Sequence, residues 1–271
     1  MSVVVKELSV GTIQLYREGA VARIMIDNLP RNYLTTTMFE QLGQRVAEFE
    51  NDADLRVAVI QGSGDRLYTV GADIHEMDPI THLEDRHDEA VRWLSQVHAV
   101  LDHIEHSSKV FICAMKGISY GGGLEIAGAC DIRIASEDAR FAMPEVKLGI
   151  IPGYGGTQRI RRLIGVGHTL ALVLGAQEID AETAHLWGLV DIVTPRGESE
   201  ITALKLAQSI AGYAPVALTA AKRAIRDGDD LALSDGLAEE QEQFVGCTAS
   251  SDFVEGVQAF LQRRAPQFRG V

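Results

Sequence analysis

The stretch VFICAMKGISYGGGLEIAGACDIRIA, residues 110–135, decides the fold class. Residues 110–115 and 131–135 are short and mostly apolar, which is typical of strands that are covered on both faces. Between them, the three glycines at 121–123 open a short helix. When a helix joins two such strands within one sheet, the crossover is right-handed and the strands are parallel. This stretch therefore predicts an α/β fold.

Segments of the same kind extend toward the N-terminus. Residues 57–60 form a further buried strand, and residues 11–27 alternate as in a β-hairpin that turns near residues 18 and 19. Residues 35–49 and 81–106 carry apolar side chains at helical spacing, the first set after threonines that suit an N-cap. Repeated strand–helix–strand units predict a largely parallel sheet.

From residue 199 onward the pattern changes to helices only. They are predicted over 200–212, 215–226, 231–250 and 251–264. We therefore expect an α/β body over residues 1–198 and a helical C-terminal region over residues 199–271. Helices that do not return to the sheet must bury their apolar faces elsewhere, for example against a neighbouring subunit.

Composition and charge exclude several classes of protein. Of the 271 residues, 46% are hydrophobic and 23% are charged, as in ordinary globular chains. No run reaches the roughly 18 apolar residues of a membrane span, and a net charge of −13 disfavours nucleic acids. Residues 1–6 carry no leader pattern, and Cys113, Cys130 and Cys247 suit reduced thiols. The expected location is the cytoplasm.

The triple glycine at 121–123 is the first candidate site element. Glycines allow close approach to the main chain, and amides at a helix start are unpaired and electropositive. A developing negative oxygen, such as the enolate of a thioester, would be stabilised there. A tight turn is the alternative explanation of the glycines.

Two glutamates are the second element. Glu125 lies in an otherwise apolar run, where burial would raise its pKa toward the range useful for proton transfer. Glu145 follows Pro144 in a turn. The alternatives are a surface glutamate at 125 and an ordinary helix-start glutamate at 145. Two carboxylates beside one oxyanion site would suit the addition of water to an activated double bond.

Ordered motifs give the chain a family resemblance over roughly residues 10–270. They are GADIHEM (71–77), GGGLEIA (121–127), CDI (130–132), FAMPEVKLG (141–149), PxxGGTQR (152–159), GLV (188–190), DFxEGxxAF (252–260) and RxPxF (264–268). In this combination the sequence resembles the enoyl-CoA hydratase/isomerase (crotonase) family. The resemblance implies a crotonase-like (ClpP/crotonase) spiral of ββα units and C-terminal helices that build a homotrimer or a dimer of trimers. It also implies an acyl-CoA substrate and neither a metal nor a separate cofactor.

By the same resemblance, the backbone amides of Ala72 and Gly122 would form the oxyanion hole, and Glu125 and Glu145 would be catalytic. Further residues would line the CoA and substrate channel, namely Arg31, Tyr33, Leu34, Gly71, Asp73, Ile74, His75, Gly121 and Tyr154. Tyr33, His75 and Tyr154 depart from the common family pattern, and the two tyrosines are bulky enough to reshape the acyl pocket. The alternative for His75 and Arg31 is a solvated surface residue.

Retention of both glutamates favours a hydro-lyase that adds water across the 2,3 double bond of an enoyl-CoA, because family isomerases usually need only the second. The main alternative is another crotonase reaction on an acyl-CoA: isomerisation, a specialised dehydration or C–C bond hydrolysis. A catalytically silent trimeric scaffold or an RNA-binding relative is the alternative from another class. The acidic balance argues against RNA, and the retained carboxylates argue against a silent scaffold.

Overall fold

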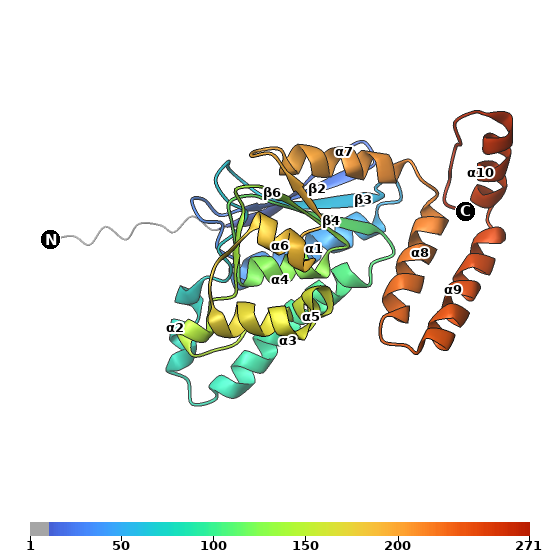
Figure 1. The fold of residues 1–271 in the computed structure, drawn as a ribbon. Coiled ribbons are helices and arrows are strands. Elements are labelled where there is room, and N and C mark those ends of the chain that lie inside the picture. The colour runs from blue at the N-terminus through green and yellow to red at the C-terminus, as the bar shows by residue number, and fades with distance from the viewer. Residues whose placement is uncertain (1–10) are drawn as a thin grey trace.

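The computed structural model describes residues 11–271, whose strands form one six-stranded and one three-stranded sheet (Figure 1). The larger sheet has the order β1-β2-β3-β4-β6-β9. Its first pair is the expected antiparallel hairpin, and every other neighbouring pair is parallel. The strands are β1 (Thr12–Glu18), β2 (Val21–Asp27), β3 (Val57–Gly62), β4 (Val110–Met115), β6 (Ile132–Ser136) and β9 (Ile192–Thr194).

The smaller sheet was not predicted, because its strands are too short to show a periodicity. It consists of β5 (Ile118–Tyr120), β7 (Arg140–Ala142) and β8 (Ile179–Asp180). β5 and β7 are parallel, with Tyr120 opposite Ala142. This pairing sets the two candidate motifs side by side, since Gly121 follows β5 and Glu145 follows β7.

Helices cover both faces of the larger sheet, in agreement with the predicted α/β class. On one face lie α1 (Thr36–Asn51), α3 (Arg86–Glu105), α4 (Gly122–Ala129) and α5 (Gly156–Gly175), which share a core with Ala58 and Ile60 of β3. The alternate residues Val57 and Val59 face α7 (Ser199–Ala211) on the other side (Figure 1). The remaining helices are η1 (Ile74–Glu76), α2 (Asp78–Thr81), η2 (Glu145–Leu148), α6 (Ala181–Trp187), α8 (Pro215–Gly228), α9 (Leu233–Thr248) and α10 (Ser251–Gln262).

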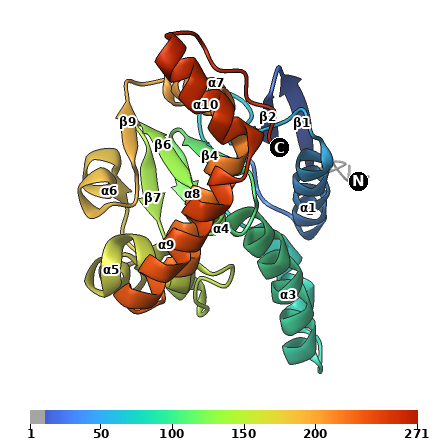
Figure 2. The same cartoon turned by 90° about the vertical axis from the view of Figure 1, so that its right-hand side faces the viewer.

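The C-terminal helices divide into two groups. α7 packs on the sheet through Ala203, Ala207 and Ile210, so this helix buries its apolar face within the chain and needs no neighbouring subunit for it. The small side chains of Ala203 and Ala207, about one helical turn apart, let α7 lie close to the strands. Helices α8–α10, by contrast, lie beside the body as an arm (Figures 1 and 2). The division at residues 198 and 199 stays a prediction.

Two further predictions concern the helix over residues 81–106 and membrane or leader segments. The helix expected over residues 81–106 is shorter, because α2 ends at Thr81 and α3 begins only at Arg86. Within residues 11–271 no helix is long and apolar enough to span a membrane. The absence of a leader pattern in residues 1–6 concerns a segment outside the described residues.

Candidate active site

Two backbone amides, those of Ala72 and Gly122, lie close together. A parallel bridge fixes the first: Leu34 N donates to Gly71 O at 2.9 Å and Asp73 N donates to Leu34 O at 2.9 Å, so the Ala72 amide points away from Leu34. A Cβ built on Gly122 would lie 3.6 Å from Ala72 N. Within residues 11–271 neither amide donates to a protein acceptor. Both proposed oxyanion donors are therefore available to a ligand.

The triple glycine has steric reasons beyond a tight turn. Gly121 has a φ of +46°, and a Cβ there would lie 2.6 Å from Glu145 Oε1. A Cβ on Gly122 would meet the Tyr154 ring at 2.9 Å, and one on Gly123 would meet the side chain of Thr69 at 2.2 Å. Only glycine fits at all three positions, so the main chain here is open to close approach.

Glu125 is buried inside α4 and only 2% exposed, so the surface alternative is wrong. Its Oε1 accepts hydrogen bonds from Tyr154 N at 2.8 Å and Gly156 N at 2.7 Å. The pKa of this carboxyl rises from 4.5 to about 8, chiefly because it is buried; the charge of Glu145 contributes to the rise, and the two amides and Arg159 oppose it. Glu125 is thus fixed in place and able to exchange a proton near neutral pH.

Glu145 begins η2, which ends in a left-handed Gly149. The residue does start a short helix, but its side chain turns toward Gly121, where Oε1 lies. Its Oε2 is buried without a hydrogen-bond partner among the described residues, and burial raises the pKa of the carboxyl. An acceptor held in this way is ready to bind water or substrate.

Tyr154 closes the site on the side of α1 and α3. Its ring is 4% exposed and meets Phe39 and Trp93 edge to face, at centroid distances of 4.9 and 5.6 Å. Burial raises the pKa of its hydroxyl, as do the charges of Glu125 and two further glutamates. Trp93 also borders a cavity of about 410 Å³ between η1, α2 and α3. Tyr154 therefore stands between this cavity and the carboxylates.

The predicted CoA-channel residues are spread over several environments. Arg31 is exposed and donates to the Tyr33 hydroxyl at 3.2 Å. Asp73 caps η1 by accepting from His75 N at 3.0 Å, and the His75 side chain is 90% exposed. Ile74 is also exposed, whereas the side chain of Leu34 lies in the core. Arg31, Ile74 and His75 are thus exposed to solvent and Tyr33 is half-buried, whereas the buried Leu34 could contact a ligand only through its backbone.

Comparison with known proteins decides the family. A family model described as enoyl-CoA hydratase/isomerase matches residues 16–271. The chain belongs to the enoyl-CoA hydratase/isomerase family.

Individual members of the enoyl-CoA hydratase/isomerase family are similar along almost the whole chain. A short-chain-enoyl-CoA hydratase of Clostridium acetobutylicum is 37% identical over 259 residues, covering 95% of this chain and 97% of that protein. A 2,3-dehydroadipyl-CoA hydratase of Escherichia coli is 37% identical over 240 residues, covering 89% and 91%. The crystal structure of an enoyl-CoA hydratase from Bacillus anthracis has a TM-score of 0.89 at 33% identity and covers 96% of this chain and 99% of that one. These matches confirm the crotonase-like fold.

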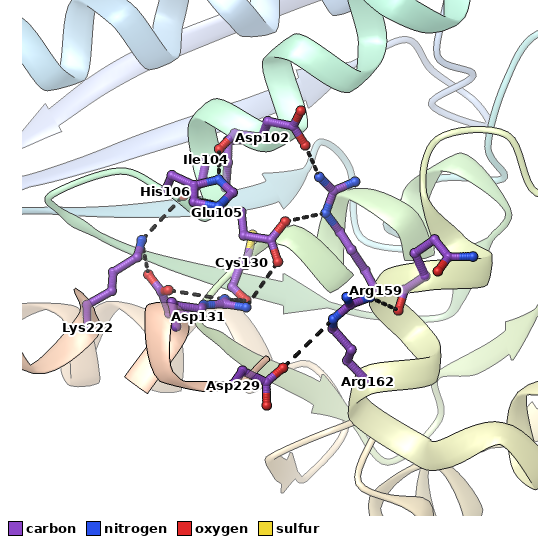
Figure 3. A network of polar contacts seen from close by, with 12 residues as sticks. Asp102, Ile104, Glu105, His106, Cys130, Asp131, Arg159, Arg162, Lys222 and Asp229 are labelled. Atoms are coloured by element: carbon purple, nitrogen blue, oxygen red, sulfur yellow. Dashed lines mark hydrogen bonds and ion pairs between the residues drawn. The ribbon is translucent and has the colours of Figure 1, made fainter. Parts of the chain in front are cut away.

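Sequence reasoning missed several residues around this family site. Phe39 and Trp93 sit at ordinary apolar helix positions, so no signal marked them as neighbours of Tyr154. Arg159 stood only as the last letter of a motif, and Glu105 as one of many helix charges. In the structure Arg159 Nε donates to Glu105 Oε2 at 2.6 Å, close behind the loop that binds Glu125 (Figure 3).

Proposed function

We propose that this chain is an enoyl-CoA hydratase, which adds water across the 2,3 double bond of an enoyl-CoA thioester. The observation that carries the proposal is that a buried carboxylate, Glu125, and a half-buried one, Glu145, lie beside the amides of Ala72 and Gly122, which have no acceptor within residues 11–271. The names of the similar hydratases point to the same reaction class.

The amides act on the thioester carbonyl. Its oxygen accepts from Ala72 N–H and Gly122 N–H, and these bonds strengthen as the carbonyl becomes an enolate oxyanion. Fixed donors of this kind typically contribute about 3–4 kcal/mol each to the transition state. The dipole of α4 begins at Gly122 and favours the same negative charge.

The carboxylates act on water. Glu125 and Glu145 hold a water molecule between them. One carboxylate accepts a proton from this water while the oxygen of the water bonds to the β-carbon. The π electrons move to the enolate, and the carbonyl re-forms as the α-carbon takes a proton from a carboxylic acid of the pair. The sum is one water added, and no redox step or metal is needed. A pKa of Glu125 of about 8 suits both directions of transfer.

We further propose that the substrate has a short acyl chain. Tyr154 packs against Gly122, and Phe39 and Trp93 hold the ring there. A chain that extends beyond the reacting carbons on this side meets the tyrosine before it can reach the cavity lined by Trp93.

The arm supports an assembly of identical subunits, and we separately propose that the protein acts in the cytoplasm. Its helices expose large apolar side chains that a partner surface would cover. They are Ile225, Leu233, Leu237, Phe244, Val245, Phe253, Val254, Val257, Phe260 and Leu261. We propose a homotrimer or a dimer of trimers, which light scattering of the purified protein tests.

The function is tested with a series of trans-2-enoyl-CoA thioesters of increasing chain length. Hydration removes the conjugated double bond, and the loss of ultraviolet absorbance measures it. We expect turnover of the short thioesters by the wild-type protein and almost none by Glu145→Gln. If no member of the series is hydrated while mass spectrometry finds isomerised or cleaved acyl-CoA products, another reaction of the family is the correct assignment.

A further inference from the structure

The loop of residues 154–156 is held from two sides. On one side the amides of Tyr154 and Gly156 donate to Glu125. On the other side Arg159 Nη1 donates to the Tyr154 carbonyl at 3.1 Å. The guanidinium occupies the space that a side chain at Gly155 would need, because a Cβ there would lie 2.2 Å from Nη1. Arg159 therefore braces the backbone segment whose amides orient Glu125.

Arg159 is in turn held by carboxylates of α3. Its side chain is 10% exposed, donates to Glu105 Oε2 at 2.6 Å and is also paired with Asp102 (Figure 3). The second oxygen of Glu105 accepts from Arg226 Nη1, at 3.2 Å, on helix α8 of the arm. The carboxylate of Glu105 thus links Arg159, which supports the loop, to Arg226 of the C-terminal arm.

Helix α8 is anchored at the same place by a buried lysine. Lys222, with a side chain 9% exposed, donates to Asp131 Oδ2 at 2.9 Å (Figure 3). It also donates to the carbonyl of Lys109 at 3.0 Å. Arg226 adds a contact to Asp131 Oδ1 at 3.3 Å. Buried ion pairs whose hydrogen bonds are satisfied fix geometry more reliably than exposed pairs do. The position of α8 is therefore transmitted to Glu105 through rigid contacts.

We infer that Arg159 is a positioning residue for Glu125, and that Glu105 and Arg226 couple its placement to the docking of α8. The inference deepens the proposed function and rests on it for the kinetic readout alone. The geometry has a direct chemical consequence. Without Arg159 the loop loses its carbonyl anchor, so the two amides no longer hold Glu125 in one orientation. Misplacement of a catalytic group by about 1 Å can cost up to 10²-fold in rate.

Charge supports the same assignment. The groups that face Glu125 are Glu145 from η2, the hydroxyl of Tyr154 from the loop and Arg159 from α5. Of these, Glu145 raises the pKa of Glu125 and Arg159 lowers it. Removing the guanidinium should therefore raise the pKa of Glu125, and any limb of the pH–rate profile that Glu125 controls moves to higher pH.

The test compares Arg159→Met, Arg159→Lys and Glu105→Gln with the wild-type enzyme on a short enoyl-CoA. For Arg159→Met we expect kcat to fall by about tenfold or more while KM changes by less than about twofold, since Arg159 lies behind the loop. Lysine keeps the charge but carries its donors on one nitrogen, which cannot reach the separate acceptors that Nε, Nη1 and Nη2 of Arg159 serve, so Arg159→Lys should recover the pKa of Glu125 and only part of kcat. Glu105→Gln combined with Arg159→Met should be non-additive because the two residues act in one network.

The matched control is Arg162→Met. Arg162 is also on α5 and also pairs with the arm, through Asp229 (Figure 3) and Asp230. Its side chain is 38% exposed and, among the described residues, its hydrogen bonds go to Gln158 and Asp230 and not to residues 154–156. Arg162→Met should alter the thermal stability at most and leave kcat unchanged. Arg226→Met, by contrast, should lower kcat by about two- to threefold through its contact with Glu105. Equal kinetic losses in the Arg159 and Arg162 variants would overturn the inference.

A second readout does not depend on the substrate. The pKa of Glu125 is measured by NMR titration of protein labelled with ¹³C at the glutamate carboxyls, with Glu125→Gln to assign the signal. The inference requires an upward shift in Arg159→Met and none in Arg162→Met, and an unchanged pKa in both contradicts it. If the wild-type protein hydrates no enoyl-CoA, the proposed function fails while this titration still decides the role of Arg159.

Discussion

The surroundings of Glu125 and of Glu145 differ although both carboxyls lie beside the same glycines, with Glu125 buried and Glu145 half-buried. Glu125 projects from a helix that is buried along its whole length, and one of its oxygens accepts two backbone amides. Glu145 projects from a short turn, and one of its oxygens has no partner among the described residues. Glu125 is therefore held in one orientation, whereas Glu145 has an oxygen free to accept a hydrogen bond, which in the proposed reaction comes from water or substrate.

The largest expected effect comes from removing either carboxylate. Glu125→Gln and Glu145→Gln should each lower kcat by about 10²–10⁴-fold, as for a lost general acid or base. The glutamine oxygen at 125 can still accept the amides of Tyr154 and Gly156, so the fold should be kept. Steady-state kinetics measure the loss. Retention of more than about a tenth of the activity by one variant would remove that residue from the chemistry.

The amide of Gly122 should rank next. Proline is tolerated in the first turn of a helix but has no N–H, so Gly122→Pro deletes one oxyanion donor and should lower kcat by about 10²–10³-fold. Gly122→Ala is the control because it also places a carbon against Tyr154 but keeps the N–H. Equal losses in the two variants would mean that crowding by Tyr154, and not the missing donor, limits the reaction.

Tyr154 lies between the two carboxylates and the neighbouring cavity, so its removal should change selectivity more than rate. For Tyr154→Ala the ratio of kcat/KM between eight-carbon and four-carbon enoyl-CoA should rise by about tenfold, since filled space in an apolar pocket discriminates to this extent. Tyr154→Phe keeps the ring and should leave the ratio unchanged. A ratio that follows the hydroxyl instead would make Tyr154 a polar participant in the site.

The sequence predicts the α/β class, the hairpin and most helices because their apolar periodicities are long enough to read. It does not reveal that β5 pairs with β7, since each strand has only three residues. That pairing brings Gly121 next to Glu145, so local pattern alone left each glutamate ambiguous between surface and site. The ordered motifs of the family favour the catalytic interpretation of both glutamates.

Other parts of the site follow from tertiary packing that has no local signature. Nothing in the spacing of α3 distinguishes Trp93, which meets Tyr154, from its other apolar positions. Nor does the sequence separate α7, which packs on the sheet, from the arm helices that follow it. Long-range ion pairs such as Glu105 with Arg226, 121 residues apart, are likewise invisible in the chain.

A smaller effect should be seen in stability. A carboxyl whose pKa is about 8 in the fold and 4.5 in the unfolded chain binds its proton more tightly when folded. Its stabilising contribution is full below about pH 4.5 and is lost as the pH rises through about 8. Because glutamine does not titrate, the melting temperature of Glu125→Gln minus that of wild type should increase over this window and then level off.

Glu255 provides the control for this titration. Its hydrogen bonds with Arg264 lower its pKa to about 2, so its stabilising contribution is lost only as the pH falls through that value. The difference in melting temperature between Glu255→Gln and wild type should therefore stay constant between about pH 5 and pH 8. A difference that is equally flat for Glu125→Gln would show that Glu125 is not protonated at neutral pH.

The smallest effects should come from the exposed channel residues, which contact neither carboxylate. Arg31 offers a fork of donors suited to phosphate, so Arg31→Ala should raise KM for a CoA thioester by about two- to fivefold. His75 is 90% exposed and paired with Asp73, so His75→Ala should raise the KM for the CoA thioester less than Arg31→Ala does. Kinetics with the matching pantetheine thioester, which lacks the nucleotide phosphates, should not distinguish the Arg31 variant from wild type. A change in kcat or in the pH profile with either variant would contradict a purely binding role. It would also mean that the environments of Glu125 and Glu145 extend as far as the predicted channel residues, whereas the close neighbours of their carboxyl oxygens are Gly121, Tyr154 and Gly156.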